Sequence, residues 1–300
     1  MPHQPATSPR PEPGTQQVTH PIRRVAVIGS PDKPGAVETL TRARQWLAPR
    51  AEVVFSEITY ESERTLAARP DLLMVLGGDG TLIAAVHGLR EKQVPIVGVN
   101  LGKLGYLADF TIEELEREGE FLFSGQLPVT RRTMMDVRIE NGAGRPQHGP
   151  AVNDCVVLAG PQFHMVQMIV TVDGDEVADI RGDGLIIATP SGSTAHNLAA
   201  GGPIVEPTGA AFILTPICPH ALTYRPLVLD AGRRLAVRLV QVNEGTTAAT
   251  DGRILRRLRV NDQIIVTRYA ADFLLVRNPR HSEWYALRRK LRWGEGPNMH

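Results

Sequence analysis

Short apolar runs alternate with amphipathic stretches over the first third of the chain. The apolar runs are typical of buried strands, and they occupy residues 23–29, 53–58, 72–77 and 95–100. The stretches at 36–48 and 81–89 repeat apolar residues at three- and four-residue steps, which predicts helices with one apolar face. Thr111, followed three residues later by Glu114, indicates the start of another helix. Strands that alternate with helices predict a parallel sheet covered on both faces.

The pattern changes near residue 128. Strand-like segments then follow one another with little helix between them, at 134–140, 152–158, 164–174, 183–189, 211–217, 234–240 and 263–268. Asp173-Gly174 predicts a tight hairpin turn, because such a turn needs positive φ. Residues 193–201 are a helical candidate inside this region, and residues 281–296 indicate a short basic helix. The middle of the chain therefore predicts a β-rich domain.

These patterns define a fold class and a set of boundaries. We expect an α/β protein whose Rossmann-like N-terminal domain, residues 21–128, precedes a β-rich, sandwich-like domain at 129–276. Residues 277–300 form a C-terminal segment. Residues 1–20 contain five prolines and few apolar side chains, which predicts a disordered tail.

Composition narrows the class of protein. The chain has 300 residues, of which 42% are hydrophobic and 22% charged, as in ordinary globular proteins. A net charge of +1 gives no general attraction to nucleic acid or to a membrane surface. No apolar run approaches the roughly 18 residues that span a bilayer. Two cysteines and the lack of a signal-peptide pattern favour a cytoplasmic location.

One acidic residue lies in a bare, glycine-rich loop. The sequence LGGDGT at 76–81 places Asp79 among Gly77, Gly78 and Gly80, between a predicted strand and a predicted helix that begins near Thr81. Ligands bind at such strand ends in α/β sheets, and N–H groups at a helix start attract anions. Asp79 then fits a base beside a hydroxyl or a group near phosphate-bound Mg²⁺, although the loop alone also fits a simple turn.

Other phosphate-loop patterns are missing from the sequence. The Walker pattern G-x-x-x-x-G-K-[ST] does not occur, and no G-x-G-x-x-G opens a helix after a predicted strand. Two further stretches, 100–110 and 182–203, are dense in small and polar residues. They could bring backbone and hydroxyl groups to a polar ligand, or they could be tight turns between strands.

Taken together, these stretches resemble the NAD kinase family. The matching blocks are GGDGT (77–81), GVNLGKLGYLADF (98–110), VND (152–154), GDGLIIATPSGSTAHNLAAGGP (182–203), PICPHALTYRP (216–226), TDG (250–252) and LRRKLRW (287–293). The resemblance covers roughly residues 23–293. Lipid kinases and phosphofructokinases use loops similar to GGDGT, so the long block at 182–203 is the more specific part.

The resemblance implies transfer of a phosphoryl group from ATP or polyphosphate to the adenosine-ribose 2′-hydroxyl of NAD, with Mg²⁺ or another divalent cation. It implies that Asp79 is the base, that Gly80 packs against the nucleotide and that Tyr106 lines the adenine side. The remaining positions that it implies for NAD contact are Asn153, Asp154, Asp183, Thr194, Ala195, His196 and Asp251. No protein cage for the metal is expected, because Mg²⁺ binds mostly to phosphates and water.

The family also implies an arrangement of the chain. NAD is expected in the crevice between the two domains, with contacts from a neighbouring copy in a homodimer or homotetramer. The last residues are expected to return to the first domain.

Three positions depart from the family pattern. Asp154 stands where many members have Glu, His196 where many have Tyr, and Ala199 where many have Ser. These changes bear on dinucleotide affinity and on the choice between NAD and NADH, more than on the type of reaction. Without the family, Asn153-Asp154 fits a turn at a strand edge and His196 fits a packing residue. The basic run 288–290 is typical of a solvated helix face.

Two other functions compete with this interpretation. A lipid or other small-alcohol kinase of the same superfamily would share GGDGT but is not expected to carry the block at 182–203. An NAD-binding sensor without catalysis would account for the three departures.

Overall fold

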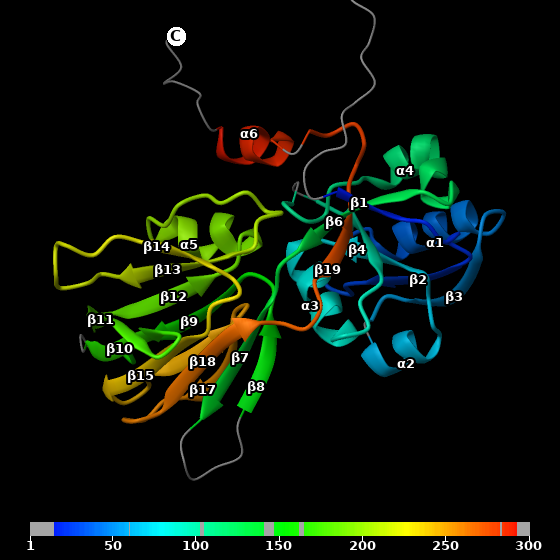
Figure 1. Cartoon of the computed structure of the whole chain (residues 1–300). Coiled ribbons are helices and arrows are strands. Elements are labelled where there is room, and N and C mark those ends of the chain that lie inside the picture. The colour runs from blue at the N-terminus through cyan, green and yellow to red at the C-terminus, as the bar shows by residue number, and fades with distance from the viewer. Residues whose placement is uncertain are drawn as a thin grey trace, which may run out of the picture.

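The alternating pattern of the first third folds as a sheet with helices on both faces (Figure 1). The computed structural model describes residues 15–59, 61–102, 105–140, 147–161, 165–282 and 284–292. The strands of the first sheet are β1 (Thr15–Val18), β2 (Arg24–Gly29), β3 (Glu52–Glu57), β4 (Leu72–Gly77), β5 (Pro95–Asn100), β6 (Leu127–Arg132) and β19 (Phe273–Val276). Its helices are α1 (Ala36–Leu47), α2 (Ser62–Ala67), α3 (Asp79–Leu89) and α4 (Ile112–Glu118), the last followed by a 3₁₀ turn at Gly119–Phe123.

The first sheet has the order β1-β6-β19-β5-β4-β2-β3. Strands β2 to β5 and β19 run parallel, whereas β6 runs antiparallel to both of its neighbours, β19 and the edge strand β1. Along β4, Leu72, Met74 and Leu76 face the core shared with α1 and α4, while Leu73 and Val75 face the core shared with α3. Burial on both faces explains why this strand is a continuous apolar run.

The spacing predicts an apolar face of Val37, Leu40, Ala43 and Leu47 on α1, and the buried face differs from it in part. Val37 is 68% exposed, and Ala36 and Trp46 are buried instead, together with Ala43 and Leu47. The indole of Trp46 packs near Phe123, so it is buried although it lies outside the predicted stripe. Helix α4 begins as predicted, because Thr111 and Glu114 form a reciprocal capping box.

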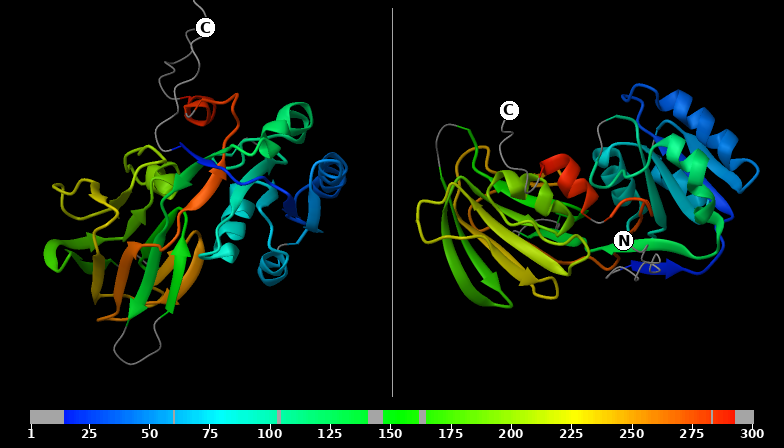
Figure 2. Two further views of the ribbon diagram at one scale, coloured as in Figure 1. Left: turned by 45° about the vertical axis from the view of Figure 1, so that its right-hand side comes forward. Right: turned by 90° about the horizontal axis from the view of Figure 1, so that it is seen from above.

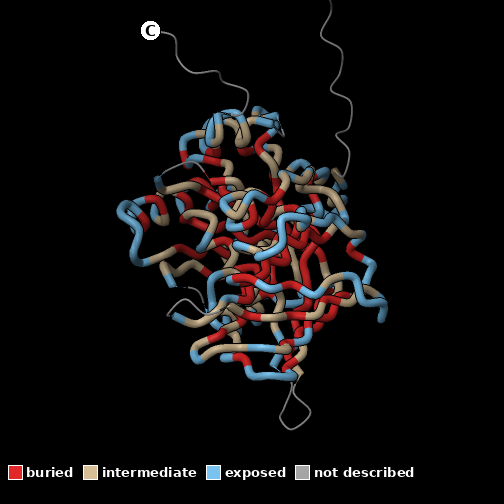
Figure 3. The backbone as a smooth tube through the Cα atoms, turned by 90° about the vertical axis from the view of Figure 1, so that its left-hand side faces the viewer, coloured by how far each residue is buried: buried red, intermediate tan, exposed pale blue. Residues whose placement is uncertain are grey.

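The second domain is a sandwich of two antiparallel sheets. One contains β7 (Met135–Glu140), β8 (Gln147–Ala151), β10 (Val166–Val172), β11 (Asp175–Gly182), β15 (Leu235–Gln241) and β18 (Gln263–Arg268). The other contains β9 (Asp154–Leu158), β12 (Gly184–Ala188), β13 (Ala211–Ile217), β14 (Leu227–Asp230), β16 (Thr247–Thr250) and β17 (Arg253–Arg257). Their facing side chains form one buried cluster. Figure 3 marks in red the backbone of the buried residues in both domains. The expected fold class is confirmed.

The chain returns to the first sheet after the sandwich. Strand β19 lies between β5 and β6, parallel to the former and antiparallel to the latter (Figure 2). Helix α6 (Tyr285–Leu291) follows it. The expected domain limits at 128 and 276 thus fall within β6 and at the end of β19.

Strand β1 corrects part of the expected N-terminal tail. Thr15–Val18 pairs with β6, although these residues fall within the segment 1–20 that we expected to be disordered. Residues 1–14 lie outside the described residues. The strand is half-exposed and polar, so its pairing depends on backbone hydrogen bonds to the open edge of β6 and leaves no apolar pattern in the sequence. Within the described part of the chain, no helix is long and apolar enough to cross a membrane.

Candidate active site

Asp79 begins helix α3 directly after strand β4, as the glycine-rich loop predicts. Its carboxylate accepts hydrogen bonds from three consecutive backbone N–H groups of residues 106–108, at 2.8, 3.0 and 3.2 Å. Two of these bonds reach Oδ1 and one reaches Oδ2. A carboxylate has about four acceptor positions, so Oδ2 retains one that is open for a ligand.

Glycines permit this approach of loop and carboxylate. A Cβ at Gly105 would lie 2.0 Å from Asp79 Oδ1, so no larger residue fits there without a shift. A Cβ at Gly77 would lie 2.5 Å from the hydroxyl of Thr81. Gly78 and Gly80 differ, because a Cβ there would meet nothing within 4 Å. Their bare backbone leaves open space beside the candidate base, where a phosphate can come close.

Asp79 opens into a cavity of about 250 Å³ between the two domains. The described residues that line it are Asp79, Tyr106, Leu107, Asn153, Ser191, Thr194, Ala195 and Lys290. Five of the predicted site residues therefore meet in one place, although they come from both domains. A neighbouring cavity of about 200 Å³ shares Tyr106 and Thr194 and extends to Trp284 beside α6.

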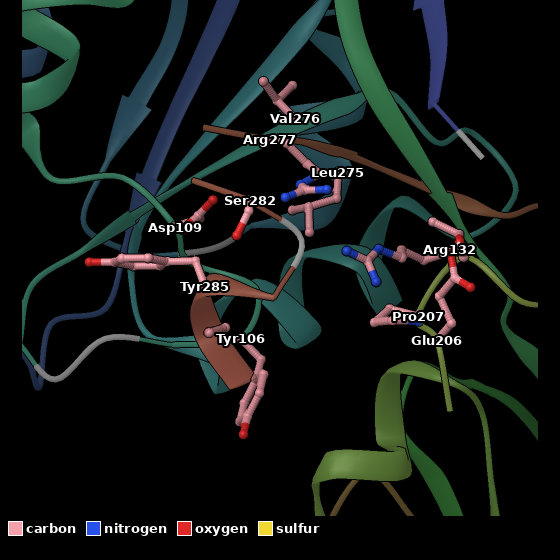
Figure 4. Close-up of a pocket in the computed structure, with 12 residues that line it drawn as sticks. Tyr106, Asp109, Arg132, Glu206, Pro207, Leu275, Val276, Arg277, Ser282 and Tyr285 are labelled. Carbon is pink, nitrogen blue, oxygen red and sulfur yellow. Dashed lines mark hydrogen bonds between the residues drawn. The ribbon is translucent and has the colours of Figure 1, made fainter. Parts of the chain in front are cut away.

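A smaller pocket adjoins these two cavities on the side of β19 (Figure 4). In the close-up, Asp109 and Ser282 point toward each other on one side, and Arg132 lies beside Glu206 on the other. Tyr106 lines this pocket as well. The loop around Tyr106 thus contributes to all three of these cavities.

Asp251 supports the turn that carries Asn153 and Asp154. Its carboxylate accepts hydrogen bonds from the consecutive backbone N–H groups of residues 152–154, at 2.7, 2.7 and 3.0 Å. His87 Nε2 lies 2.6 Å from the other side of Oδ2, and the Asp251 side chain is 1% exposed. Asp251 therefore lies beneath the turn, and the resemblance alone implies its contact with NAD.

His87 lies on the same helix as Asp79. Eight residues separate them, which is about 12 Å along a helix. Helix α3 thus presents the candidate base at its start and holds the support of the Asn153-Asp154 turn near its end. The sequence offers no signal for this second role, since His87 has the appearance of an ordinary polar residue in a helix.

Asp154 sits in an acidic and buried environment. Burial raises the pKa of its carboxyl to about 7, and the negative charge of Asp251 adds to the increase. The residue is 5% exposed at the first position of β9. A carboxyl that is half-protonated near neutral pH can donate as well as accept a hydrogen bond.

The block 182–203 owes its small residues to close packing. A Cβ at Gly192 would lie 2.0 Å from the Asn153 carbonyl oxygen, and one at Gly202 would lie 2.0 Å from Asn197 Oδ1. The Asn197 amide donates to two backbone carbonyls and accepts from the Thr215 hydroxyl at 2.6 Å. The segment folds as a 3₁₀ turn at Ser191–Thr194 and the short helix α5 (His196–Ala199). This framework presents Thr194 and Ala195 to the cavity.

Asp183, His196 and Ala199 lie away from that cavity. Asp183 is exposed at the opposite end of β12, six residues before Thr189, which is roughly 20 Å along a strand. His196 and Ala199 are exposed on α5. None of the three is among the described residues that line the Asp79 cavity.

Three residues that line the cavity were not predicted as site residues, namely Leu107, Ser191 and Lys290. Ser191 Oγ and Tyr106 Oη are buried without a hydrogen-bond partner among the described residues, and both belong to residues that line the cavities. Buried hydroxyls usually have a partner, so a bound ligand is expected to supply one. Lys290 reaches the cavity from α6, 3.8 Å from Asp79 Oδ2. The described residues contain no group of three or more His, Cys, Asp or Glu side chains that could hold a metal ion.

Two family models and several curated relatives match this chain. The family model described as ATP-NAD kinase N-terminal domain matches residues 31–126, and the ATP-NAD kinase C-terminal domain matches residues 152–278. The NAD kinase of Rhodopirellula baltica is 36% identical over 273 residues, covering 90% of this chain and 86% of the relative. The NAD kinase of Geobacter sulfurreducens is 40% identical over 225 residues, covering 75% and 79%.

Solved structures show the same fold. The yeast NADH kinase complexed with NADH superposes with a TM-score of 0.82 at 24% identity, covering 93% of this chain and 90% of that one. The NAD kinase from Archaeoglobus fulgidus in complex with ATP gives a TM-score of 0.72 at 27% identity, covering 90% and 98%. With relatives this similar over nine-tenths of its length, the chain belongs to the NAD kinase family.

Proposed function

We propose that this phosphotransferase moves the γ-phosphoryl group of ATP to the 2′-hydroxyl of the adenosine ribose of NAD. The observation that carries the proposal is Asp79 Oδ2, which has an open acceptor position in a cavity lined by residues of both domains. Bare backbone at Gly78 and Gly80 gives phosphate access beside it. Asn153 and Thr194 supply polar groups for the ribose and its surroundings.

The chemistry needs alignment and charge neutralisation more than covalent help. The ribose oxygen forms a bond to the γ-phosphorus, and its proton passes to the Asp79 carboxylate. The bond from the γ-phosphorus to the bridging oxygen breaks, and its electron pair leaves with ADP. The three N–H groups of residues 106–108 fix the carboxylate so that one oxygen faces the hydroxyl.

A divalent cation fits this site as a partner of the phosphates. Three acceptor positions of Asp79 are occupied by backbone N–H groups, which leaves no room for a multidentate protein site there. Mg²⁺ commonly keeps phosphate oxygens and waters as ligands. When bound, it supplies neutralising charge to the phosphates.

The test is an assay of purified chain with NAD, ATP and Mg²⁺, in which NADP is measured with an NADP-specific dehydrogenase. We expect NADP to form, and ³¹P NMR to show the new phosphate on the 2′ position. Absence of NADP with both ATP and polyphosphate would overturn the proposal. Phosphorylation of diacylglycerol instead would favour the lipid-kinase alternative, and NAD binding without turnover would favour the sensor.

We propose further that the active form is a homo-oligomer. Its motivation is the position of Asp183 and His196, which lie away from the Asp79 cavity of the same chain. A second copy brings them to the NAD of the first. Mixing inactive Asp79→Asn with Asp183→Ala should then restore part of the activity, since one site in each mixed pair is intact. If the mixture shows no gain and sedimentation reveals a monomer, the shared site is wrong. The cytoplasmic location stays a prediction.

A further inference from the structure

Lys290 reaches into the active site from the last described helix. Its Nζ lies 3.8 Å from Asp79 Oδ2 and 4.4 Å from the centre of the Tyr106 ring. Among the described residues that line the Asp79 cavity, it is the only cation. Figure 1 shows α6 lying across the region where the two domains meet.

The position of α6 depends on an anchor that precedes it. His281 stacks on Tyr285 with ring centres 3.8 Å apart, and its Nδ1 lies 2.6 Å from Asp109 Oδ1. Asn278 donates to the backbone carbonyl of Asp109 at 3.2 Å. Asp109 belongs to the loop that follows Tyr106, so the segment that holds Asp79 also holds α6. No residue of α6 itself is buried.

The ion pair with Asp79 does not by itself explain why Lys290 lies at this cavity. A separation of 3.8 Å exceeds hydrogen-bond distance, and a partly exposed ion pair contributes little to stability. The Asp79 carboxylate would also repel an incoming phosphate at the place where transfer must occur. A cation beside that carboxylate offsets the repulsion, and a lysine ammonium serves well as a point charge for phosphate.

We propose that Lys290 is a catalytic residue that contacts a non-bridging oxygen of the γ-phosphoryl group during transfer. This inference rests on the proposed function. Lys290 keeps its proton throughout, while the hydroxyl proton passes to Asp79 and the electron pair of the broken bond leaves with ADP. The sequence has no Walker lysine; the C-terminal helix supplies the charge that such a residue provides elsewhere.

The test compares Lys290→Met and Lys290→Arg with Arg288→Ala, an exposed residue on the same helix that is not among the described residues lining the cavity. We expect Lys290→Met to lower kcat by about 10²–10³-fold, as for loss of one charge-stabilising group. The kcat of Lys290→Arg should be at least tenfold higher than that of Lys290→Met, and the kcat of Arg288→Ala should equal that of the wild type. Calorimetry should show an unchanged Kd for NAD and weaker binding of inorganic tripolyphosphate in Lys290→Met.

Each contrary result has a distinct meaning. A kcat of Lys290→Met equal to or above that of wild type would overturn the inference, and an increase would indicate that the lysine blocks Asp79. Loss of NAD affinity in Lys290→Met equal to the loss of kcat would show that the lysine only positions α6. If the wild type makes no NADP at all, the proposed function fails instead. Tripolyphosphate binding would then still decide whether Lys290 binds phosphate.

Discussion

Two aspartate side chains of this protein accept the same set of backbone hydrogen bonds at two different places. Asp79 accepts hydrogen bonds from three consecutive N–H groups of the 106–108 loop, and Asp251 accepts three from the 152–154 turn. Their surroundings differ, because the Asp79 side chain is 29% exposed and that of Asp251 is 1% exposed. The fourth acceptor position faces a cavity in one case and His87 in the other.

The difference separates a chemical role from a supporting one. A carboxylate with a fourth position open to ligand can take a proton, whereas a carboxylate with all four positions filled can only hold its neighbours. Helix α3 connects the two, since it begins at Asp79 and carries His87. Four substitutions test this contrast.

The largest effect is expected for Asp79→Asn. The amide retains the shape of the side chain but cannot accept the hydroxyl proton, so kcat should fall by about 10²–10⁴-fold. NAD affinity, measured by calorimetry, should stay within a few fold of wild type. Turnover within tenfold of wild type would show that Asp79 is not the base.

The second largest effect is expected for Gly105→Ala, whose kcat should fall by about 100-fold. Displacing a catalytic group by about an ångström lowers the rate by this much. The new Cβ would lie 2.0 Å from Asp79 Oδ1 and must push the carboxylate or the loop aside. Gly102→Ala is the matched control, since a Cβ there meets nothing within 4 Å. Equal losses in steady-state assays of both variants would mean that loop flexibility, and not the carboxylate position, limits activity.

Asp251→Asn should act mainly on stability. Its amide group would face backbone N–H donors, and the expected loss in the free energy of unfolding is about 3 kcal/mol. Asp173→Asn is the control, because it changes an aspartate in a turn of the same kind. In Asp173-Gly174, as in Asp251-Gly252, each of the two residues has a positive φ. Asp173 is exposed and its change should cost less than about 0.5 kcal/mol.

The measurement is the midpoint of urea unfolding followed by circular dichroism. Similar shifts for the two variants would show that the turn conformation matters and the buried carboxylate does not.

The smallest effect is expected for Asp154→Asn, and it depends on pH. The folded state raises the Asp154 pKa to about 7, above the ordinary value of about 3.9, so the folded protein binds the proton more tightly. The contribution of Asp154 to stability therefore falls as pH rises through this window and is constant above it. Between pH 5 and pH 8, the free energy of unfolding of the wild type should fall by about 2 kcal/mol relative to that of the variant. Parallel pH profiles of the unfolding midpoint for both proteins would contradict this environment for Asp154.

Local patterns predict the parts of the fold whose partners are near in sequence. Strand β4 is apolar throughout because both faces are buried, and its run of six residues is recognisable. Strand β19 is equally apolar but has four residues, and its partner β5 lies far earlier in the chain. Strand β17 contains three arginines and an exposed Ile254, since it forms the edge of its sheet, so no apolar alternation marks it.

The candidate site likewise contains parts that depend on contacts between residues distant in sequence, and local patterns do not predict those parts. Asp79, Asn153 and Thr194 are predicted and meet in one cavity. Lys290 belongs to a basic run that is typical of a solvated helix face, and only the docking of α6 brings its ammonium within 3.8 Å of Asp79 Oδ2. The supporting role of Asp251 depends on a buried contact between two domains, which spacing along the chain does not encode.

The insertion of β19 into the first sheet has a consequence for synthesis. Domains generally fold in the order in which they leave the ribosome. Here the first sheet keeps an open position between β5 and β6 until residues 273–276 have been made, by which time every strand of the sandwich has already been synthesised. Lys290 follows only after that strand. A chain whose translation stops before residue 273 therefore contains Asp79 and its glycines. It lacks both strand β19, which completes the first sheet, and Lys290.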